Sequence, residues 1–263
     1  MPNAQAAIVI MMLTTSAEIW WQWQRRLKAN APIWSESQTP IVPVNLIAVV
    51  LTVVLIGLSL VSVLLPSRSV ATAEKIPSIK NVWDGCLLNS ALVLVLFPIV
   101  VGGKFQGLAG LGFGLANFRR QFFEGMETAL ASFLPVLLML LVTSPLRTPQ
   151  GTHPLLLLLK QDGHLQTFAA VVLAAVILAP LAEELMFRVV LLGWLKTRTN
   201  STEAIVISSI AFAAVHGPLD GLALLPLALL LGYHYDRRRS FWSVFVAHAF
   251  FNLTNIVLAM SSR

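Results

Sequence analysis

Eight apolar runs, each near the length of a membrane-crossing helix, constrain the fold of this chain most strongly. A helix needs about 20 mostly apolar residues to cross the hydrocarbon core of a bilayer. Runs that approach this length lie at residues 4–21, 44–65, 84–103, 123–143, 167–195, 203–217, 219–235 and 241–260. The sixth and seventh runs are short, so they can span only with tilt or local thinning of the bilayer. The sequence therefore predicts an all-α, polytopic integral membrane protein with about eight transmembrane helices.

The composition favours a membrane protein over a soluble domain. Hydrophobic residues make up 57% of the 263 residues and charged residues only 11%, whereas soluble domains carry about 25% charged residues. A single cysteine, Cys86, leaves no partner for an internal disulfide and is expected to be a small buried side chain. The N-terminus lacks the basic region of a secretory signal, so the first apolar run is expected to be retained. We therefore expect a multi-pass protein of a bacterial plasma membrane.

The basic residues predict how the helices are oriented. Lys and Arg number 18 against 12 Asp and Glu, a net charge of +6, and they collect in the loops between apolar runs. Loops at one face carry eleven of them: Arg25, Arg26, Lys28, Lys104, Arg119, Arg120, Lys196, Arg198, Arg237, Arg238 and Arg239. Loops at the other face carry six: Arg68, Lys75, Lys80, Arg147, Lys160 and Arg263. Because cytoplasmic loops are enriched in Lys and Arg, the first face is predicted to be cytoplasmic and both termini to lie outside. Since no basic groove is interleaved with aromatic residues, a nucleic-acid partner is not expected.

The first part of the chain offers no recognisable chemistry. Residues 1–160 are predicted to hold transmembrane helices of unassigned role, and residues 161–263 to carry the functional site. The glycine-rich segment 107–118 lacks phosphate-loop spacing and follows no strand, which favours a flexible or interfacial connection. The leucine run 155–159 is too short to span and is expected at the membrane surface. Tryptophans near the ends of the apolar runs predict an interfacial belt: Trp20, Trp21, Trp23, Trp83, Trp194 and Trp242.

Ionisable residues inside the apolar runs are the strongest functional signal. A charged residue at the centre of a spanning helix costs roughly 2.5–3.5 kcal/mol on insertion scales, so it is retained for a reason. Among the acidic residues only Glu183 and Glu184 fall deep within a run, in the stretch LAPLAEELMFRVVLLGWL (178–195). Among the histidines only His216 and His248 have apolar surroundings on both sides. These four residues are the candidates for a buried polar site.

The candidates are predicted to lie at similar depths in the membrane. At 1.5 Å per residue, Glu183 lies about 20 Å from the cytoplasmic edge and His216 about 21 Å. His248 and Asn252 lie about 12 and 18 Å from the same edge. Three separate helices therefore bring polar groups to one level, which predicts a shared site among the C-terminal four helices.

Helical phase separates the two adjacent carboxylates. Residues four apart share a helix face, whereas neighbours differ by about 100°. Glu184 can therefore pair with Arg188, while Glu183 points elsewhere. Pro180 is expected to free a backbone carbonyl one turn back, and a kink there could help to open a cavity.

Each residue also has a structural interpretation. Glu184 and Arg188 could form a purely structural ion pair, and a lone histidine in an apolar helix is usually a hydrogen-bonded packing residue. Asn252 could simply join helices, and Phe212 could pack against the core or form a wall of the pocket. The matching depth of the set favours function over these separate interpretations.

Three motifs in this region resemble those of a known family. EELMFR (183–188), FAAVH (212–216) and HAFFN (248–252) match, in order, the E-E-x-x-x-R, F-x-x-x-H and H-x-x-x-N motifs of the CPBP family. These are intramembrane proteases of the type II CAAX prenyl endopeptidase and bacteriocin-processing (abortive infection) group. The resemblance covers roughly residues 165–260.

The resemblance implies peptide-bond hydrolysis on membrane-associated or lipidated peptide substrates, with the bilayer as the other partner. It implies that Glu183 and His216 activate the attacking water and that His248 and Asn252 stabilise the oxyanion. Glu184, Arg188 and Phe212 would support them. The family is also labelled as metalloproteases, and Glu183, His216 and His248 are acceptable zinc ligands. No H-E-x-x-H pair is present, so metal-free catalysis is favoured and zinc stays open.

Two other classes of function are compatible with the sequence. Intramembrane Glu, His and Arg residues also build proton or solute relays, but a relay predicts polar residues across the full membrane thickness rather than at one level. An inactive scaffold that binds membrane partners is the other alternative.

Overall fold

The computed structural model describes the chain except for residues 1, 39–41, 66–75, 103–107, 148–153 and 262–263, and every regular element in the described part is a helix. The first four long helices are α1 (Pro2–Lys28), α2 (Leu46–Leu64), α3 (Ile79–Val101) and α4 (Phe118–Thr143). After η3 (Ser144–Leu146) and α5 (Pro154–Gln161), a single long segment comprises α6 (Leu165–Val172), η4 (Leu173–Leu178), α7 (Ala179–Glu184), η5 (Leu185–Leu192) and α8 (Gly193–Leu195). The last three helices are α9 (Ser201–Val215), α10 (Pro218–Arg238) and α11 (Phe241–Ser261). The all-α prediction is confirmed.

Each predicted apolar run corresponds to one long helical segment. Five segments in the described part are long and apolar enough to cross a membrane: Leu46–Leu64, Ile79–Val101, Phe118–Leu146, Leu165–Leu195 and Phe241–Ser261. The chain is therefore a multi-pass integral membrane protein. Whether α1, α9 and α10 also cross, which would give eight spans, stays a prediction.

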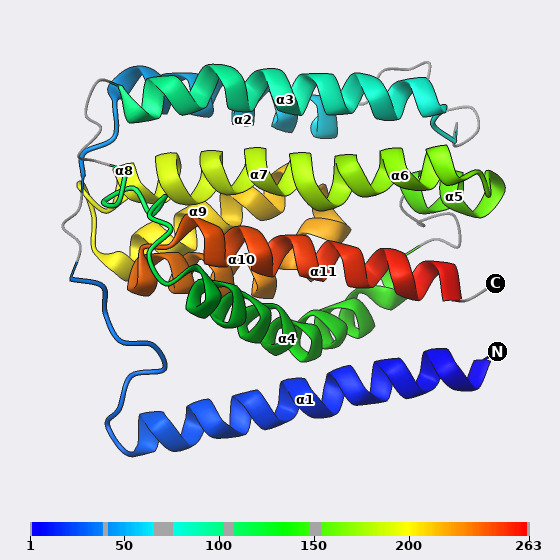
Figure 1. The fold of residues 1–263 in the computed structure, drawn as a ribbon, viewed down its shortest axis with the longest axis horizontal. Coiled ribbons are helices and arrows are strands. Elements are labelled where there is room, and N and C mark those ends of the chain that lie inside the picture. Colours follow the sequence, from blue (N-terminus) through cyan, green and yellow to red (C-terminus); the bar gives the residue numbers. More distant parts are fainter. Residues whose placement is uncertain (1, 39–41, 66–75, 103–107, 148–153, 262–263) are drawn as a thin grey trace.

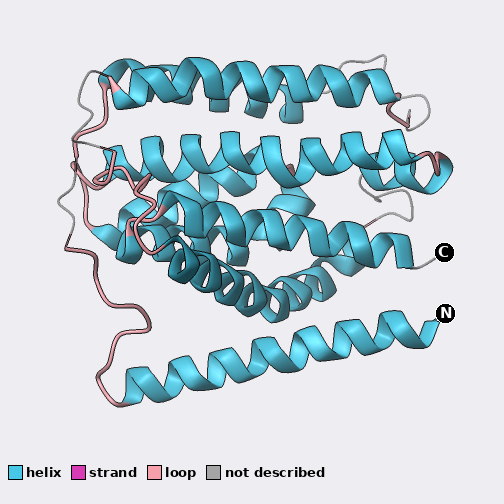
Figure 2. Ribbon diagram, viewed as in Figure 1, coloured by secondary structure: helices cyan, strands magenta, loops and turns pink. Residues whose placement is uncertain are grey.

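The long helices run roughly alongside one another and alternate in direction, so that both termini lie at the same end of the bundle (Figure 1). Helices α2 and α3 form one edge, α1 forms the opposite edge, and the segment α6–α8 lies between them with α11. The loops collect at the two ends of the helices (Figure 2). The largest buried cluster forms where η5, α4, α10 and α11 meet, with Val190, Leu231 and Ala247 fully buried. The N-terminal helix α4 therefore shares its core with the C-terminal helices.

A tight hairpin joins α9 to α10. Asn200 caps the start of α9 by accepting a hydrogen bond from the backbone of Glu203. The turn uses Gly217 at φ 85°, a region that disfavours side chains, followed by Pro218 at the first position of α10. A Cβ atom on Gly221 would lie 1.9 Å from the carbonyl oxygen of Ala213. The two helices can approach this closely only because residue 221 is glycine.

The long segment α6–α8 contains two π-helical stretches, which flank the acidic pair. In η4 the backbone N–H of Ala179 bonds the carbonyl oxygen of Ala174, five residues back. The same register would pair residue 180 with Ala175, but Pro180 has no N–H. The amide of Asn252 donates to that carbonyl instead, at 2.8 Å. The expectation that Pro180 frees a carbonyl is therefore met, with the free group five residues back rather than four.

The expectations for the periphery have mixed outcomes. Leu158 and Leu159 of α5 are buried against other helices, and the position of the leucine run at the membrane surface stays a prediction. Trp23 is no interfacial anchor, since it is buried and its indole donates to Glu127. The glycine-rich segment is packed only in part: Leu111 is buried and its carbonyl accepts from Tyr235, whereas Leu115 is exposed, so an interfacial connection stays a prediction.

Candidate active site

A cavity of about 790 Å³ opens between the N-terminal and C-terminal helices. Four of its lining residues are the ones that the sequence singled out: Glu183, His216, His248 and Asn252. They come from α7, from the C-terminal end of α9 and from α11. Three distant stretches of sequence therefore meet around one hollow.

Glu183 lies at the centre of this group. Its Oε2 is 3.8 Å from Nε2 of His216 and 3.8 Å from Nε2 of His248. The side chains of Glu183 and His216 are 23% and 26% exposed, and that of His248 is 4% exposed. The carboxylate thus faces the cavity rather than lipid. Both gaps are too long for direct hydrogen bonds, and each can be bridged by a water molecule.

The ring of His216 is held in one orientation by its own helix. His216 is the residue at which α9 ends. Its Nδ1 donates to the carbonyl oxygen of Phe212 at 2.7 Å, because a carbonyl can only accept. Nε2 of the neutral ring is therefore the acceptor nitrogen, and it is the nitrogen that faces Glu183.

His248 is oriented by the second acidic residue. Nδ1 of His248 lies 2.8 Å from Oε1 of Glu184, and both side chains are buried. An ionised carboxylate can only accept, so Nδ1 carries the proton and Nε2 points to Glu183. Glu184 thus contacts a histidine as well as Arg188, a contact that the sequence did not predict.

Glu184 and Arg188 form the predicted pair one helical turn apart. Nε of Arg188 is 3.1 Å from Oε2 of Glu184, and both side chains are fully buried. The contact does not meet the angular criteria of a hydrogen bond, so the attraction is between charges rather than along a directed bond. The guanidinium also lies over the ring of Phe212, with Cζ 4.8 Å from the ring centroid. Burial in a low-dielectric site makes both contacts count for more than they would at a surface.

Phe212 lies behind the site rather than in the wall of the cavity. Its ring is fully buried and packs against the rings of His216 and His248, with centroids 4.5 and 5.6 Å away. One aromatic side chain therefore contacts both imidazoles and the buried arginine.

Asn252 reaches the same cavity with part of its hydrogen-bonding capacity used. One N–H of its amide is donated to Ala175, and the amide has a second N–H. The π-helical stretch thus fixes the position of the asparagine.

The proposed zinc ligands converge without forming a closed metal site. A tetrahedral zinc site has metal–ligand distances near 2.0–2.2 Å, which places its ligand atoms closer together than the two 3.8 Å separations. Within the described ranges, no group of three or more His, Cys, Asp or Glu residues is arranged to hold a metal ion. Zinc therefore stays an untested alternative.

The C-terminal region matches a family model described as "Type II CAAX prenyl endopeptidase Rce1-like" over residues 165–254. This range contains all three motifs and the residues that meet in the cavity. Over this range the chain is similar to the CPBP family. Among curated proteins, "Putative membrane peptidase YdiL" of Bacillus subtilis (strain 168) is 28% identical over 97 residues, which is 36% of this chain and 40% of that relative. No solved structure matches the chain.

Residues 165–254, which match the family model, do not form the cavity alone. Asn81 and Asn89 of α3 and Arg147, which follows η3, also line it. Sequence reasoning missed these N-terminal contributions, although Asn89 is a polar residue inside an apolar run. The family match begins at residue 165, after these helices, so it gives no role to their residues.

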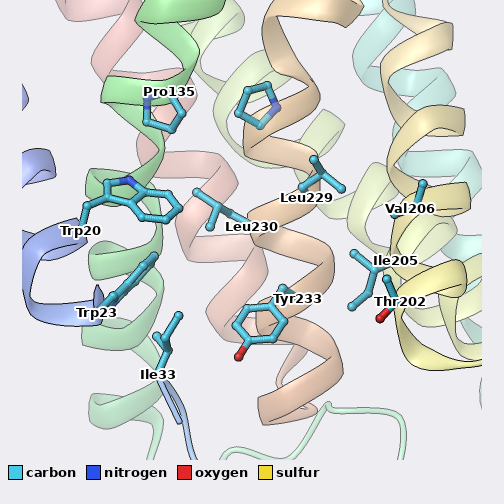
Figure 3. A pocket seen from close by; sticks show the side chains of 11 residues that line it. Trp20, Trp23, Ile33, Pro135, Thr202, Ile205, Val206, Leu229, Leu230 and Tyr233 are labelled. Carbon is cyan, nitrogen blue, oxygen red and sulfur yellow. The ribbon is translucent and has the colours of Figure 1, made fainter. Parts of the chain in front are cut away.

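A second hollow, of about 430 Å³, lies away from the polar site. Trp20 and Trp23 of α1 flank it on one side, α9 flanks it on the other, and Leu230 and Tyr233 of α10 form its floor (Figure 3). It is lined almost entirely by apolar groups and holds no acid–base pair. It has none of the chemistry found beside Glu183.

Proposed function

We propose that this chain is an intramembrane endopeptidase that hydrolyses peptide bonds of membrane-associated substrates. The observation that carries the proposal is the position of Glu183, whose carboxylate oxygen is 3.8 Å from Nε2 of both His216 and His248 within one cavity. The CPBP match over residues 165–254 supports the same reaction class. The similarity to the Bacillus subtilis protein named as a putative membrane peptidase supports it as well.

Glu183 and His216 are proposed to activate water. A water molecule about 2.8 Å from Oε2 of Glu183 could also reach Nε2 of His216 across the 3.8 Å gap. Glu183 would take one proton while the water oxygen attacks the peptide carbonyl carbon. When the carbon–nitrogen bond breaks, that proton would pass to the departing amine. His216 would orient the water through its acceptor nitrogen.

His248 and Asn252 are proposed to stabilise the oxyanion. His248 can donate from Nε2 when its ring carries both protons, with Nδ1 donating to the carboxylate of Glu184. Asn252 would donate its second N–H. Donors aimed at a developing oxyanion are typically worth about 3–4 kcal/mol in the transition state.

Glu184 and Arg188 are proposed as positioning residues. Arg188 offsets the charge of Glu184, so Glu183 is the carboxylate left to act as a base. Phe212 holds Arg188 and both rings in place from behind. None of these three residues lines the cavity.

The proposed substrates are peptides held at the membrane, including lipidated, CAAX-like or peptide-maturation substrates. The cavity wall is mixed: its four asparagines can pair with a peptide main chain, and the apolar side chains between them can contact the side chains or the lipid of a substrate. The transport alternative has weaker support, because the ionisable side chains meet at a single site.

The proposal is tested by cleavage of membrane peptides and of a lipid-anchored peptide library, analysed by mass spectrometry. Wild type should generate products, Glu183→Gln should not, and Glu203→Gln should cleave as wild type does because Glu203 is exposed at the start of α9. Equal rates for wild type and Glu183→Gln would reject the assigned base. Liposome flux lost in Glu183→Gln without any proteolysis would favour transport.

A further inference from the structure

The cavity has its mouth at the end of the bundle that holds both termini. Beyond Glu183 its lining includes Asn81 in the first turn of α3, Leu155 of α5 and Asp220 in the first turn of α10. Helix α3 begins at that end and α5 lies there, whereas α10 begins farther into the bundle (Figure 1). None of the lining residues comes from the described loops at the opposite end, between α8 and α9 or between α10 and α11. Among the described residues, the cavity lining thus extends to the end that holds the termini and not to the opposite end.

The opposite end carries most of the positive charge. Ten of the eleven basic residues assigned to that face lie in the described ranges, whereas the face at the mouth retains Lys80, Arg147 and Lys160. Contacts between loops confirm that these basic residues share one end. Arg238 bonds Glu124 near the start of α4, at 2.9 Å. Lys196, which follows α8, pairs with Asp236 near the end of α10.

The difference in basic residues between the two ends indicates which side of the membrane the mouth of the cavity faces. Loops rich in Lys and Arg remain in the cytoplasm, while acidic residues contribute little to orientation. The ion pairs at the basic end therefore do not weaken the assignment. The cytoplasmic face is then the closed end of the cavity.

We propose that the cavity opens to the non-cytoplasmic side of the membrane, and that the substrate is a peptide segment presented from that side. This inference rests on the proposed protease function. It excludes substrates confined to the cytosol, and it selects exported peptides and the outward-facing segments of membrane proteins.

The chemistry of the mouth suits such a peptide. Asn89 and Asn255 each donate an amide N–H to a carbonyl of their own helix, at 3.0 and 3.1 Å. Their side-chain oxygens can accept from the N–H groups of an extended substrate. Arg147 and Asp220 add one charge of each sign at 2.7 Å from each other. The mouth thus offers hydrogen bonds without a net charge.

Accessibility can be tested by cysteine labelling that leaves every charge in place. In a Cys86→Ala background, Gln161→Cys marks the end of α5 at the mouth, and Thr197→Cys marks the opposite face; both positions are exposed. A membrane-impermeant maleimide on intact cells should label Gln161→Cys and leave Thr197→Cys unlabelled. Inverted membrane vesicles should show the reverse. Labelling of Thr197→Cys alone in intact cells would overturn the inference.

A second arm tests whether the mouth is the route of the substrate. In the same background, Asn81→Cys places a thiol at the mouth. Coupling it to a bulky impermeant maleimide from outside should reduce cleavage at least tenfold, while the same treatment of Thr197→Cys should not. Undiminished cleavage after complete coupling would overturn the inference. The labelling experiment does not depend on protease activity. If the protein cleaves no peptide, the proposed function is refuted, but the labelling still shows which side of the membrane the mouth faces.

Discussion

Glu184 accepts a hydrogen bond from Nδ1 of His248 at 2.8 Å, and its other oxygen lies 3.1 Å from Nε of Arg188. One buried carboxylate therefore links the arginine of its own helix to the histidine of another. The adjacent residues Glu183 and Glu184 therefore have different surroundings and contacts. Glu184 orients a ring inside the protein, while Glu183 faces the cavity.

The Glu184–Arg188 pair should be strongly coupled in stability. Removing one partner of a buried ion pair leaves an uncompensated charge, which typically costs about 3–5 kcal/mol. Arg188→Leu should therefore lower the free energy of unfolding by about that amount, and adding Glu184→Gln should restore part of it. Unfolding in detergent micelles measures all three variants. If the double variant loses the sum of the two single losses, the charges are not coupled.

Glu183 should matter for catalysis and little for folding. Its side chain is partly exposed to the cavity, so Glu183→Gln removes a charge without burying an unpaired group. Loss of a general base typically lowers kcat by about 10²–10⁴-fold. We expect such a loss with a melting temperature close to that of wild type, measured on the same purified sample. A large drop in melting temperature would instead make Glu183 a structural residue.

Much of this site was predictable from helical geometry. The phase difference between adjacent residues separates Glu183 from Glu184, and counting residues along each run places His216 at the depth of Glu183. Both inferences use only the regular geometry of one helix. The motifs then identify which polar residues belong together.

The contacts between helices were not predictable in the same way. Helical phase shows that Glu184 and Glu183 face different directions, but it does not show that α11 packs against the Glu184 face. The carbonyl of Ala175 was missed because an α-helical count places the group freed by Pro180 one residue later. The contribution of α3 was missed because Asn81 and Asn89 are isolated polar residues, and that of α4 because its lining residues, Val136 and Leu140, are apolar like their neighbours.

Asn252 should combine a catalytic and a structural effect. Asn252→Ala removes an oxyanion donor, which typically lowers kcat about 10²–10³-fold. It also leaves the half-buried carbonyl of Ala175 without this donor, a loss of about 1 kcal/mol in stability. Cleavage kinetics should show the effect in kcat rather than in KM, and thermal unfolding should show the second loss. A change confined to KM would assign Asn252 to substrate binding.

Exhaustive chelation should leave activity intact. The proposed water activation uses Glu183 and His216, and the described chain holds no arranged metal cluster. We therefore expect cleavage at the wild-type rate after dialysis against a strong chelator, with the zinc content measured by mass spectrometry. Activity that disappears on chelation and returns with added zinc would establish the zinc-dependent form of the reaction.

The α9–α10 hairpin should depend on a glycine that carries no chemistry. A Cβ atom at residue 221 would lie 1.9 Å from the backbone of Ala213, three residues before His216, so Gly221→Ala must push the two helices apart. Because Nε2 of His216 is held 3.8 Å from Glu183 by this helix end, we expect both stability and kcat to fall. Gly57→Ala in α2 is the matched control, since no atom lies within 4 Å of its added Cβ. Thermal unfolding and cleavage should show wild-type behaviour for the control, and equal behaviour of the two variants would mean that the hairpin adjusts without moving His216.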